Sequence, residues 1–524
     1  MKRAAAWILI LALSVSLFSG CNTDPGAYVA TGNGLTWDDP HETTPEVTQP
    51  QEQALTMVYS PDKSMHPLQS TDYSNRALFS LIYQGLFATD PDYNVTPILC
   101  KSYTYTDDMR TYTFHIDPRA TFSDGTPLTV EDVYQTYLFA QKSAYYSGRF
   151  THFREISVTE VGALKIQLST AYENLPLLLD IPIVKAADLV TDPETNQLLV
   201  QQPVGTGPYM FEKTVTGARL RRRANWWCDA ELAVTASSIP LKEGGTPAQI
   251  RDAFEFDDVG LVCADPGSDS YADYRCDYEL WDCENGNFLY LGCNLLEEAL
   301  FSDDELRAAL TYAIDRTYIA DTYYAGFARA ATLAVSPQSP YYSASLAARY
   351  EYDGISLNNM LAKKNLIGTE IRLLVCKDDT MRLRVARDIG EMLTEAGFVV
   401  DMVELSRSRF LEALQYRNYD IYLGQTRLSP TMDLSPFFRS NGSLSYGGLT
   451  DAEIYAMCLE ALANRGNYYN LHKMVADDGS LIPVLFQSYA VYADRGLVTG
   501  LTPSRDNVFY YDLGRTMAEA LTDE

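Results

Sequence analysis

Basic side chains are scarce in this sequence. Its 524 residues include 41 Lys and Arg against 69 Asp and Glu, which gives a formal net charge of −28 at pH 7. A surface of this sign repels the phosphates of nucleic acids and the headgroups of anionic lipids. The composition therefore argues against a nucleic-acid partner and against direct adsorption to an anionic membrane.

Sequence patterns that mark catalytic and metal sites are missing as well. There is no G-x-S-x-G elbow, no H-E-x-x-H pair, no phosphate-binding loop and no set of kinase motifs. The five histidines, at positions 41, 66, 115, 152 and 472, are scattered without the spacing of metal ligands. We therefore expect no catalysis, no metal site and no cofactor.

Cysteine is present, but it forms no recognisable metal motif. Eight cysteines follow Cys21, at positions 100, 228, 263, 276, 283, 293, 376 and 458, without a C-x-x-C pair. Export from the cytoplasm would permit disulfides, for which the four cysteines between 263 and 293 are candidates. Burial as small thiols is the alternative. The sequence leaves both states open.

The N-terminus has the pattern of an exported and anchored protein. Lys2-Arg3 precede an apolar run of 15 residues at 4–18, which is too short for a comfortable membrane span. The run ends in Leu-Phe-Ser-Gly before Cys21, which resembles a bacterial lipobox whose cysteine is lipidated; a plain signal peptide is the alternative. Residues 22–53 contain four prolines, six threonines and no Lys or Arg. That composition predicts a disordered tether.

Three stretches of the remaining chain have specific local patterns. In 111–141, alternating apolar residues predict a strand, Asp124-Gly125 a tight turn, and Thr129 the cap of a helix. Residues 203–209 read PVGTGPY, and their glycines and prolines force an irregular, stiff turn. In 302–327, Ser302 and Glu305 predict a capping box. We interpret Asp315-Arg316 as a structural ion pair near the end of that helix.

The amino-acid sequences of these stretches resemble those of a known protein family. Residues 112–133 resemble y-T-F-x-L-R-x-x-x-x-F-x-D-G-x-P-(L/V)-T-A-x-D-V, the signature of the extracytoplasmic solute-binding proteins of family 5, with Asp117-Pro118 where a basic residue is usual. This is the dipeptide-, oligopeptide- and nickel-binding class that serves ABC importers. The family also carries P-V-G-T-G-P-Y and v-R-x-A-l-x-x-A-I-D-R, which match 203–209 and 306–316. The resemblance runs in order from about Leu55 to near the C-terminus.

This resemblance implies both a fold and a role. The expected fold is α/β and bilobal, periplasmic-binding-protein-like (type II, cluster C-like), with a hinge. After the signal peptide (1–21) and the tether (22–53), the first lobe would comprise 54–265 plus 481–524, with an inserted subdomain at about 76–175. The second lobe would comprise 266–480, with a βαβ unit at 370–405. The lobes would close on a peptide or similar polar solute and deliver it to the transmembrane subunits of an ABC permease. The protein would be a monomer, held by its lipid at the outer face of the bacterial cytoplasmic membrane or in the periplasm.

The ligand contacts expected from the resemblance centre on residues 424–433. Peptide-binding members place an Asp after a Trp here, to pair with the amino terminus of the peptide. This chain has no Trp in the stretch, and Arg427 stands about where that Asp would be. Arg427 would then receive an anionic group or pair with a nearby acid as scaffold, and Asp433 could replace the missing Asp. Gln425 belongs to the same stretch. Three aromatic residues, Tyr73, Trp281 and Tyr422, are candidates for the cleft wall, with burial in the core as the alternative.

Other functions remain open at this point. Within the family, the cargo could be a nickel chelate or an oligosaccharide instead of a peptide. Outside it, the chain could be an extracellular hydrolase on an unrecognised fold, or an adhesin without a cleft. The missing nucleophile and metal motifs count against the hydrolase.

Overall fold

The structure, a computed structural model, describes residues 55–191, 198, 202–215, 217–228, 232, 234–265, 274–498, 500–511 and 521–522. The predicted signal peptide with Cys21 and the predicted tether of 22–53 lie outside the described residues. Within the described ranges, no helix combines the length and the hydropathy needed to cross a membrane.

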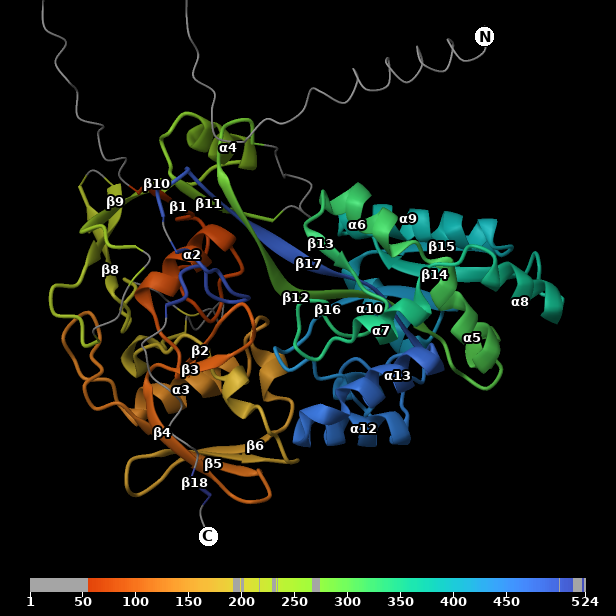
Figure 1. Cartoon of the computed structure of the whole chain (residues 1–524), viewed down its shortest axis with the longest axis horizontal. Coiled ribbons are helices and arrows are strands. Elements are labelled where there is room, and N and C mark those ends of the chain that lie inside the picture. Colours follow the sequence, from red (N-terminus) through yellow and green to blue (C-terminus); the bar gives the residue numbers. More distant parts are fainter. Residues whose placement is uncertain are drawn as a thin grey trace, which may run out of the picture. The chain divides into compact units, whose positions relative to one another are not determined.

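One large mixed sheet runs through the described chain (Figure 1). Its strands, in spatial order, are β15 (Val399–Leu405), β14 (Glu370–Cys376), β16 (Ile421–Arg427), β12 (Glu279–Cys293), β17 (Leu481–Ala493), β11 (Leu261–Ala264), β1 (Met57–Tyr59), β10 (Ser238–Glu243), β9 (Gly217–Arg222) and β8 (Tyr209–Thr214); β13 (Ala328–Ala330) also pairs with β17. The two long strands, β12 and β17, pair antiparallel from Glu279 opposite Ala493 to Gly292 opposite Leu481. They therefore connect the two ends of the sheet.

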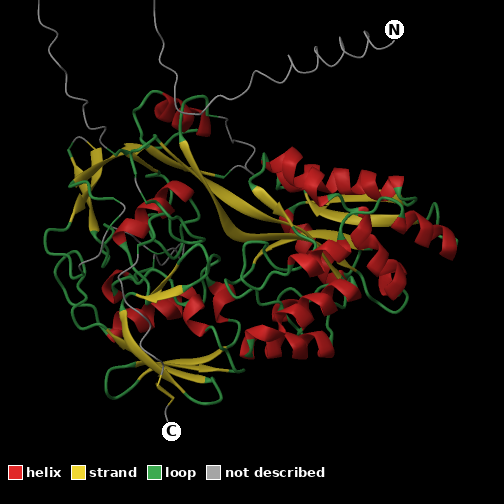
Figure 2. Ribbon diagram, in the orientation of Figure 1, coloured by secondary structure: helices red, strands yellow, loops and turns green. Residues whose placement is uncertain are grey.

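Two smaller sheets complete the strands. The first contains β18 (Leu521–Thr522), β4 (Cys100–Tyr105), β5 (Thr111–Ile116), β7 (Leu164–Leu168) and β6 (Phe153–Val158), and the second contains β2 (Phe87–Thr89) and β3 (Val95–Pro97). Figure 2 shows the five-stranded sheet at the lower left, apart from the large one.

Helices cover the sheets and fill the connections between strands (Figure 2). The α-helices are α2 (Tyr73–Ile82), α3 (Val130–Ala140), α4 (Pro247–Glu255), α5 (Asp304–Leu310), α6 (Arg316–Tyr324), α7 (Ala344–Ala347), α8 (Ser356–Lys364), α9 (Thr380–Glu395), α10 (Arg407–Tyr416), α11 (Ser435–Phe438), α12 (Ala452–Ala463) and α13 (Tyr468–Asp478). The 3-10 helices are η1 (Ser147–Phe150), η2 (Leu175–Leu178), η3 (Ala186–Asp188), η4 (Leu300–Ser302), η5 (Thr311–Ala313), η6 (Ala348–Tyr350) and η7 (Arg465–Asn467).

The local predictions for 111–141 are confirmed. In β5, Tyr112 and Phe114 are buried while their polar neighbours are more exposed, as a half-buried strand requires. Gly125 has φ +85 in the turn that follows. Thr129 caps α3, and its hydroxyl and the carboxylate of Asp132 form a reciprocal capping box. The predicted βαβ unit is also present, as parallel β14 and β15 joined by α9.

The PVGTGPY turn packs tightly against the end of α2. A Cβ at Gly205 or Gly207 would overlap the carbonyl oxygen of Ile82. The amide of Gly207 donates a hydrogen bond to that same carbonyl, at 2.8 Å. The glycines are therefore required because the backbones approach closely.

Two predictions for 302–327 are wrong in detail. The helix α5 is capped by Asp303, whose carboxylate accepts from the amide of Leu306 at 3.1 Å; the Ser302 hydroxyl instead donates back to Ala299. Asp315 and Arg316 are structural but do not pair as ions within the described contacts. Asp315 caps α6, whereas the buried Arg316 donates to the carbonyls of Pro483 and Thr311, at 2.8 and 2.9 Å.

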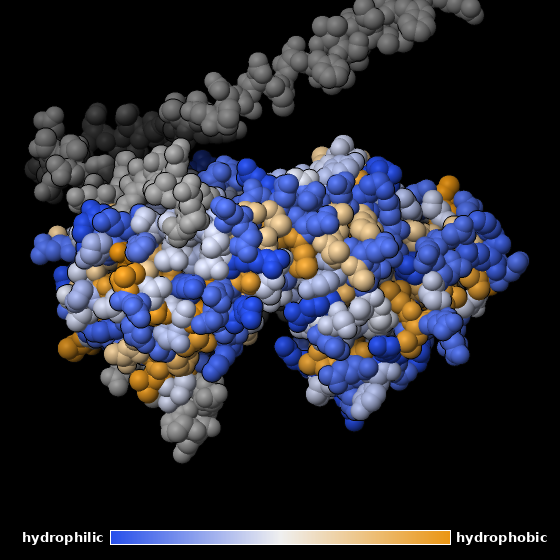
Figure 3. Space-filling view, turned by 90° about the horizontal axis from the view of Figure 1, so that it is seen from below, coloured by the Kyte–Doolittle hydropathy of each residue, from blue (hydrophilic) through white to orange (hydrophobic). Residues whose placement is uncertain are grey.

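The hydrophobic core is divided along the sheet. One large cluster is formed mostly by residues of 55–265 and 489–509, with Cys283 and Leu462, and two further clusters are formed by residues of 288–486. A smaller fourth cluster combines residues of 58–262 with Phe327, Ala490 and Tyr492. We name the part made of 55–265 and 487–511 the N-terminal region and the part made of 287–486 the C-terminal region. On the face seen in Figure 3, hydrophilic side chains predominate and the surface is indented between two halves. The lobe boundaries given above remain a prediction.

All eight cysteines after Cys21 are present as thiols. Seven are buried, and Cys276 is half-buried. Burial raises the pKa of the Cys283 and Cys293 thiols to about 12. Of the two alternatives left open by the sequence, disulfides or buried thiols, the structure thus matches buried thiols.

Candidate functional site

A single carboxylate, Asp506, lies among four arginines. Its oxygens are 2.6 Å from Arg427 Nη2 and 2.5 Å from Arg149 Nη2, with Arg76 and Arg505 at 3.6 and 3.7 Å. The Asp506 side chain is only 2% exposed. Burial acts to raise the pKa of Asp506, but the arginines outweigh it and hold that pKa well below the usual range.

These charges come from distant parts of the chain. Arg76 lies on α2 and Arg149 on η1, in the N-terminal region, while Arg427 is the last residue of β16 in the C-terminal region. Arg505 and Asp506 lie in the segment after β17. The cluster therefore joins the two regions.

The donors of Arg427 are taken up by the protein itself. Besides Asp506, Arg427 donates to the carbonyls of Asn285 and Tyr145, at 2.9 and 3.2 Å. Its guanidinium carbon also lies 3.8 Å from the centre of the Tyr145 ring. Arg427 thus pairs with a nearby acid, as in the scaffold alternative, and a contact with ligand remains a prediction.

The other polar candidates, Asp433 and Gln425, also have protein partners. Asp433 is buried and lies 3.1 Å from His152 Nε2, and it accepts from the amide of Ser435 at 2.8 Å. Burial acts to raise the pKa of Asp433, but the interactions with His152 and the hydrogen bonds from Ser435 together outweigh it and lower that pKa. Gln425 accepts from Arg382 at 2.9 Å. Arg427 and Asp433 line one cavity of about 190 Å³.

The three aromatic candidates have different surroundings. Tyr422 is fully buried and packs edge-to-face against Tyr290 and Tyr419 in a core of the C-terminal region. Trp281 is half-buried and packs on the core of the N-terminal region. Tyr73 stacks on Tyr489, with ring centres 5.3 Å apart, and accepts from Asn285. It lines a cavity of about 360 Å³ at the carboxyl ends of β1, β10 and β11.

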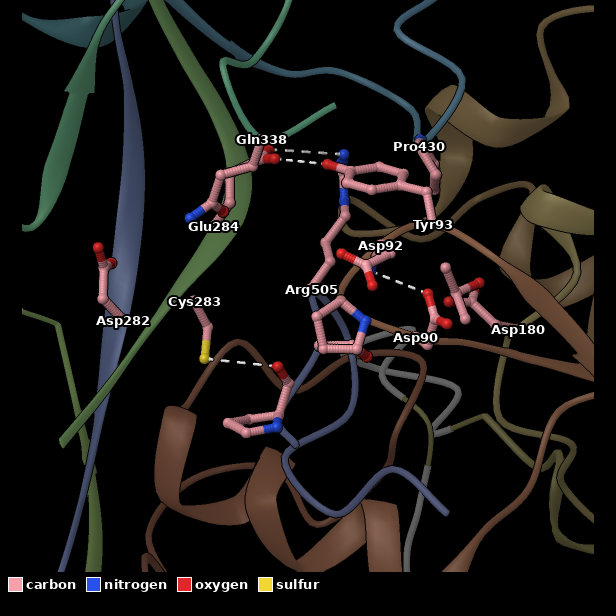
Figure 4. A pocket seen from close by; sticks show the side chains of 14 residues that line it. Asp90, Asp92, Tyr93, Asp180, Asp282, Cys283, Glu284, Gln338, Pro430 and Arg505 are labelled. Carbon is pink, nitrogen blue, oxygen red and sulfur yellow. Dashed lines mark hydrogen bonds and ion pairs between the residues drawn. The ribbon is translucent and has the colours of Figure 1, made fainter. Parts of the chain in front are cut away.

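A further cavity, of about 330 Å³, is lined by both regions, and we name it the inter-region pocket. It is lined by Thr89, Asp90, Pro91, Asp92, Tyr93, Asp180, Asp282, Cys283, Glu284, Gln338, Pro430, Pro503, Ser504 and Arg505. Figure 4 shows Glu284, Tyr93 and the end of Arg505 meeting at one side, with Asp90, Asp92 and Asp180 grouped to the right and Asp282 set apart from them. None of these residues was a candidate in the sequence.

The inter-region pocket contains buried polar atoms without hydrogen-bond partners. Glu284 Oε2 accepts from the Tyr93 hydroxyl at 2.5 Å, but Glu284 Oε1 has no hydrogen-bond partner among the described residues. The same is true of Arg505 Nε and Nη1. The side chains of Glu284 and Arg505 are only 3% and 5% exposed. Glu284 Oε1 and Arg505 Nη1 are ionic neighbours at 3.9 Å, and Arg505 Nε lies 3.7 Å from Asp506, but both distances exceed that of a hydrogen bond. Since buried polar atoms are nearly always satisfied, these atoms point to a hydrogen-bond partner that the described residues do not supply.

Metal binding has no comparable support. Across the residues that the structure describes, no group of three or more His, Cys, Asp or Glu side chains is arranged to hold a metal ion. The pocket instead offers carboxylates, a guanidinium and a tyrosine hydroxyl, which suit a polar organic molecule.

Comparison with known proteins identifies the family. Residues 94–446 match the model of the bacterial extracellular solute-binding proteins, family 5. The chain belongs to this family. The resemblance deduced from the sequence is confirmed, and its members are solute-binding proteins rather than enzymes.

Individual relatives are distant, and the matched part of the curated ones is limited. The glutathione-binding protein GsiB of Escherichia coli O1:K1 is 23% identical over 304 residues, which span 57% of this chain and 58% of GsiB.

Solved structures have the same fold. A putative peptide-binding protein, AppA from Clostridium difficile, has a TM-score of 0.70 at 17% identity, covering 87% of this chain and 98% of AppA. NikZ from Campylobacter jejuni, solved with Ni(L-His), has a TM-score of 0.60 at 17% identity, covering 88% of this chain and 97% of NikZ. The expected periplasmic-binding-protein fold is therefore confirmed.

Proposed function

We propose that this protein captures a small polar solute in the inter-region pocket and delivers it to the transmembrane subunits of an ABC importer. The observation that carries the proposal is the set of unsatisfied buried atoms of Glu284 and Arg505 in a cavity lined by both regions. Such a cavity becomes accessible when two lobes part and is sealed from water when they close.

The hinge of this motion is assigned to β12 and β17. We take the lobes to be 54–265 with 481–524 and 266–480, as the sequence predicts, because these two strands carry the chain between the two sets of cores. The pairing of β12 with β17 is irregular between Glu284 and Phe288, where Gly286 has φ +78. A break in the ladder beside the pocket suits a bend, since fewer hydrogen bonds oppose it there.

The cargo is proposed to be a short peptide or a solute of similar size. GsiB is named for glutathione, AppA for peptides, and NikZ was solved with a nickel–histidine complex. A cavity of about 330 Å³ lies at the lower end of the range of ligand pockets, about 300–1,000 Å³. This size favours a small solute over a long extended peptide.

We further propose that the protein is a lipid-anchored monomer outside the cytoplasmic membrane. Lipidation of Cys21 would supply the anchor, and residues 22–53 the tether. Two or more acyl chains hold a protein stably at a membrane, whereas one chain does not.

Thermal unfolding with a panel of solutes tests this function. The panel contains dipeptides, tripeptides, glutathione, single amino acids and nickel–histidine. A ligand at 100 times its Kd adds about 2.7 kcal/mol to the free energy of unfolding, which is a readily measured rise in Tm. Gln338→Trp is the control, because Gln338 is exposed at the rim of the pocket and a large ring there blocks entry. The function is contradicted if no solute raises Tm, and the pocket is the wrong site if the variant responds like the wild type.

A further inference from the structure

We propose that the solute carries a positively charged side chain, an ammonium or a guanidinium distinct from the α-ammonium that every peptide has, and that this group lies in the inter-region pocket against Asp92, Asp90 and Glu284. This inference rests on the proposed function and narrows it to one class of cargo. Neither the family nor its named relatives require it, since the charge of the pocket is a property of this chain.

The wall of the inter-region pocket carries an excess of negative charge. Five carboxylates line it, at positions 90, 92, 180, 282 and 284, against one basic side chain, Arg505. Two of the five are committed elsewhere, because Asp180 pairs with Arg149 and Asp282 with Arg329. Three carboxylates then remain for a single arginine.

The carboxylates of Asp90 and Asp92, in the loop between β2 and β3, are not paired with basic side chains within the described residues. Asp90 accepts from the amides of Asp92 and Asn94, at 2.9 and 2.8 Å, and from the Asn94 side chain. These partners are neutral, and within the described ranges neither Asp90 nor Asp92 forms an ion pair with a basic side chain. Asp92 is exposed at the pocket mouth. The two charges are therefore uncompensated and adjacent, which attracts a cation from solution.

The buried carboxylate of Glu284 lacks a close cationic partner. Among the residues that the structure describes, its one cationic neighbour is Arg505, whose Nη1 is 3.9 Å from Oε1, beyond hydrogen-bonding distance. The same guanidinium is 3.7 Å from Asp506, so its charge is shared between two carboxylates. A buried carboxylate oxygen in this position is best satisfied by a donor that is itself charged.

The positive charge nearby faces a different cavity. Arg427 and Arg149, which pair with Asp506, line the smaller cavity of about 190 Å³. An anionic group on the solute is consequently disfavoured beside Asp92 and favoured only at the unsatisfied Nε and Nη1 of Arg505 or toward that smaller cavity. The site thereby discriminates by the sign of the charge, and it does so chiefly by repulsion of anions.

Calorimetry with three matched dipeptides tests the inference. Lysyl-alanine, methionyl-alanine and glutamyl-alanine share a backbone and differ in the charge of one side chain. We expect lysyl-alanine to bind at least tenfold more tightly than methionyl-alanine, and glutamyl-alanine to bind most weakly. In Glu284→Gln, which keeps an acceptor for Tyr93, the advantage of lysyl-alanine should fall at least tenfold. Asp92→Asn, at an exposed position, should lower the advantage of lysyl-alanine severalfold. This variant provides the test if Glu284→Gln fails to fold.

The outcomes separate this inference from the function on which it rests. Equal or tighter binding of glutamyl-alanine overturns the cationic cargo while leaving the solute-binding function intact. An unchanged preference in both variants also overturns it. If none of the three dipeptides binds, the cationic assignment fails, whereas the function is judged separately by the wider panel described above.

Discussion

Arg427 Nη2 lies 2.6 Å from Asp506, 79 residues further along the chain and in the other region of the molecule. The pair is buried, with side-chain exposures of 14% and 2%. Asp506 thus occupies the position beside Arg427 that an anionic ligand group was expected to take. Arg427, which the sequence left open as a ligand contact or as scaffold, therefore joins the two regions, and we propose the inter-region pocket as the site that selects the cargo.

Asp506→Asn should destabilise the protein by about 3–5 kcal/mol, the usual cost of removing one partner from a buried ion pair. The substitution leaves Arg76, Arg149 and Arg427 buried without their shared carboxylate. The free energy of unfolding from a urea titration measures the effect. Asp62→Asn is the control, since its pair with Lys63 is exposed and its loss should cost no more than about 0.5 kcal/mol. Equal effects of the two substitutions would contradict the structural role of Asp506.

His472 should make the protein less stable in acid. Burial lowers the pKa of His472 to about 3, and neither ring nitrogen has a hydrogen-bond partner among the described residues. Below about pH 6.5 the unfolded chain binds a proton at this histidine and the folded chain does not, so the free energy of unfolding falls by about 1.4 kcal/mol per pH unit down to about pH 3.

His472→Leu should remove that contribution and flatten the pH dependence by the same amount. Urea titrations between pH 7 and pH 4.5 measure the slope in each protein. His115→Gln, at an exposed position, should leave the slope as it is in the wild type. A slope unchanged by His472→Leu would show that this histidine is protonated in the folded protein.

Gly205→Ala should cost about 3 kcal/mol, because the new Cβ overlaps the carbonyl oxygen of Ile82 and the backbone must shift. Gly162→Ala is the matched comparison. Gly162 has φ +77, but a Cβ there would have open space, so only the positive φ opposes it, at about 1 kcal/mol. Thermal unfolding of both variants distinguishes a close approach from a conformational requirement; similar losses would refute the packing explanation of the PVGTGPY turn.

Cys21→Ser should move the protein from the membrane fraction to the soluble fraction of cells that export it. The reason is that the proposed acyl chains are attached through this cysteine. Fractionation and the mass of the mature N-terminus provide the measurement. Cys276→Ser, at a half-buried cysteine, is the control and should remain with the membrane. Membrane association of Cys21→Ser equal to that of the wild type would contradict the lipid anchor.

Local chemistry explains which elements could be predicted from the sequence. Alternating burial in β5 and the Thr129 cap depend only on neighbouring residues, and both are confirmed. The cap of α5 was misplaced by one residue, since Ser302 and Asp303 are both capping types and only the three-dimensional path of the chain selects between them. The predicted Asp315-Arg316 ion pair failed for a similar reason, because the buried guanidinium donates to the carbonyl of Pro483 in β17, which is distant in sequence, and to the carbonyl of Thr311.

The inter-region pocket could not be predicted from local sequence patterns. Tyr93, Glu284 and Arg505 meet in one pocket, but they are separated by 191 residues or more and belong to no local pattern. The loop at 90–93 has polar and aromatic residues typical of many surface turns. Only the fold brings these side chains together, and only the structure shows that atoms of Glu284 and Arg505 lack hydrogen-bond partners among the described residues.

Native mass spectrometry of the protein purified without denaturation shows whether the inter-region pocket holds a solute. We expect a small solute of defined mass bound to the wild-type protein and absent from Gln338→Trp, whose new side chain blocks the inter-region pocket. A wild-type protein that carries no solute and acquires none from the panel, or a solute retained equally by both proteins, would contradict solute binding in that pocket.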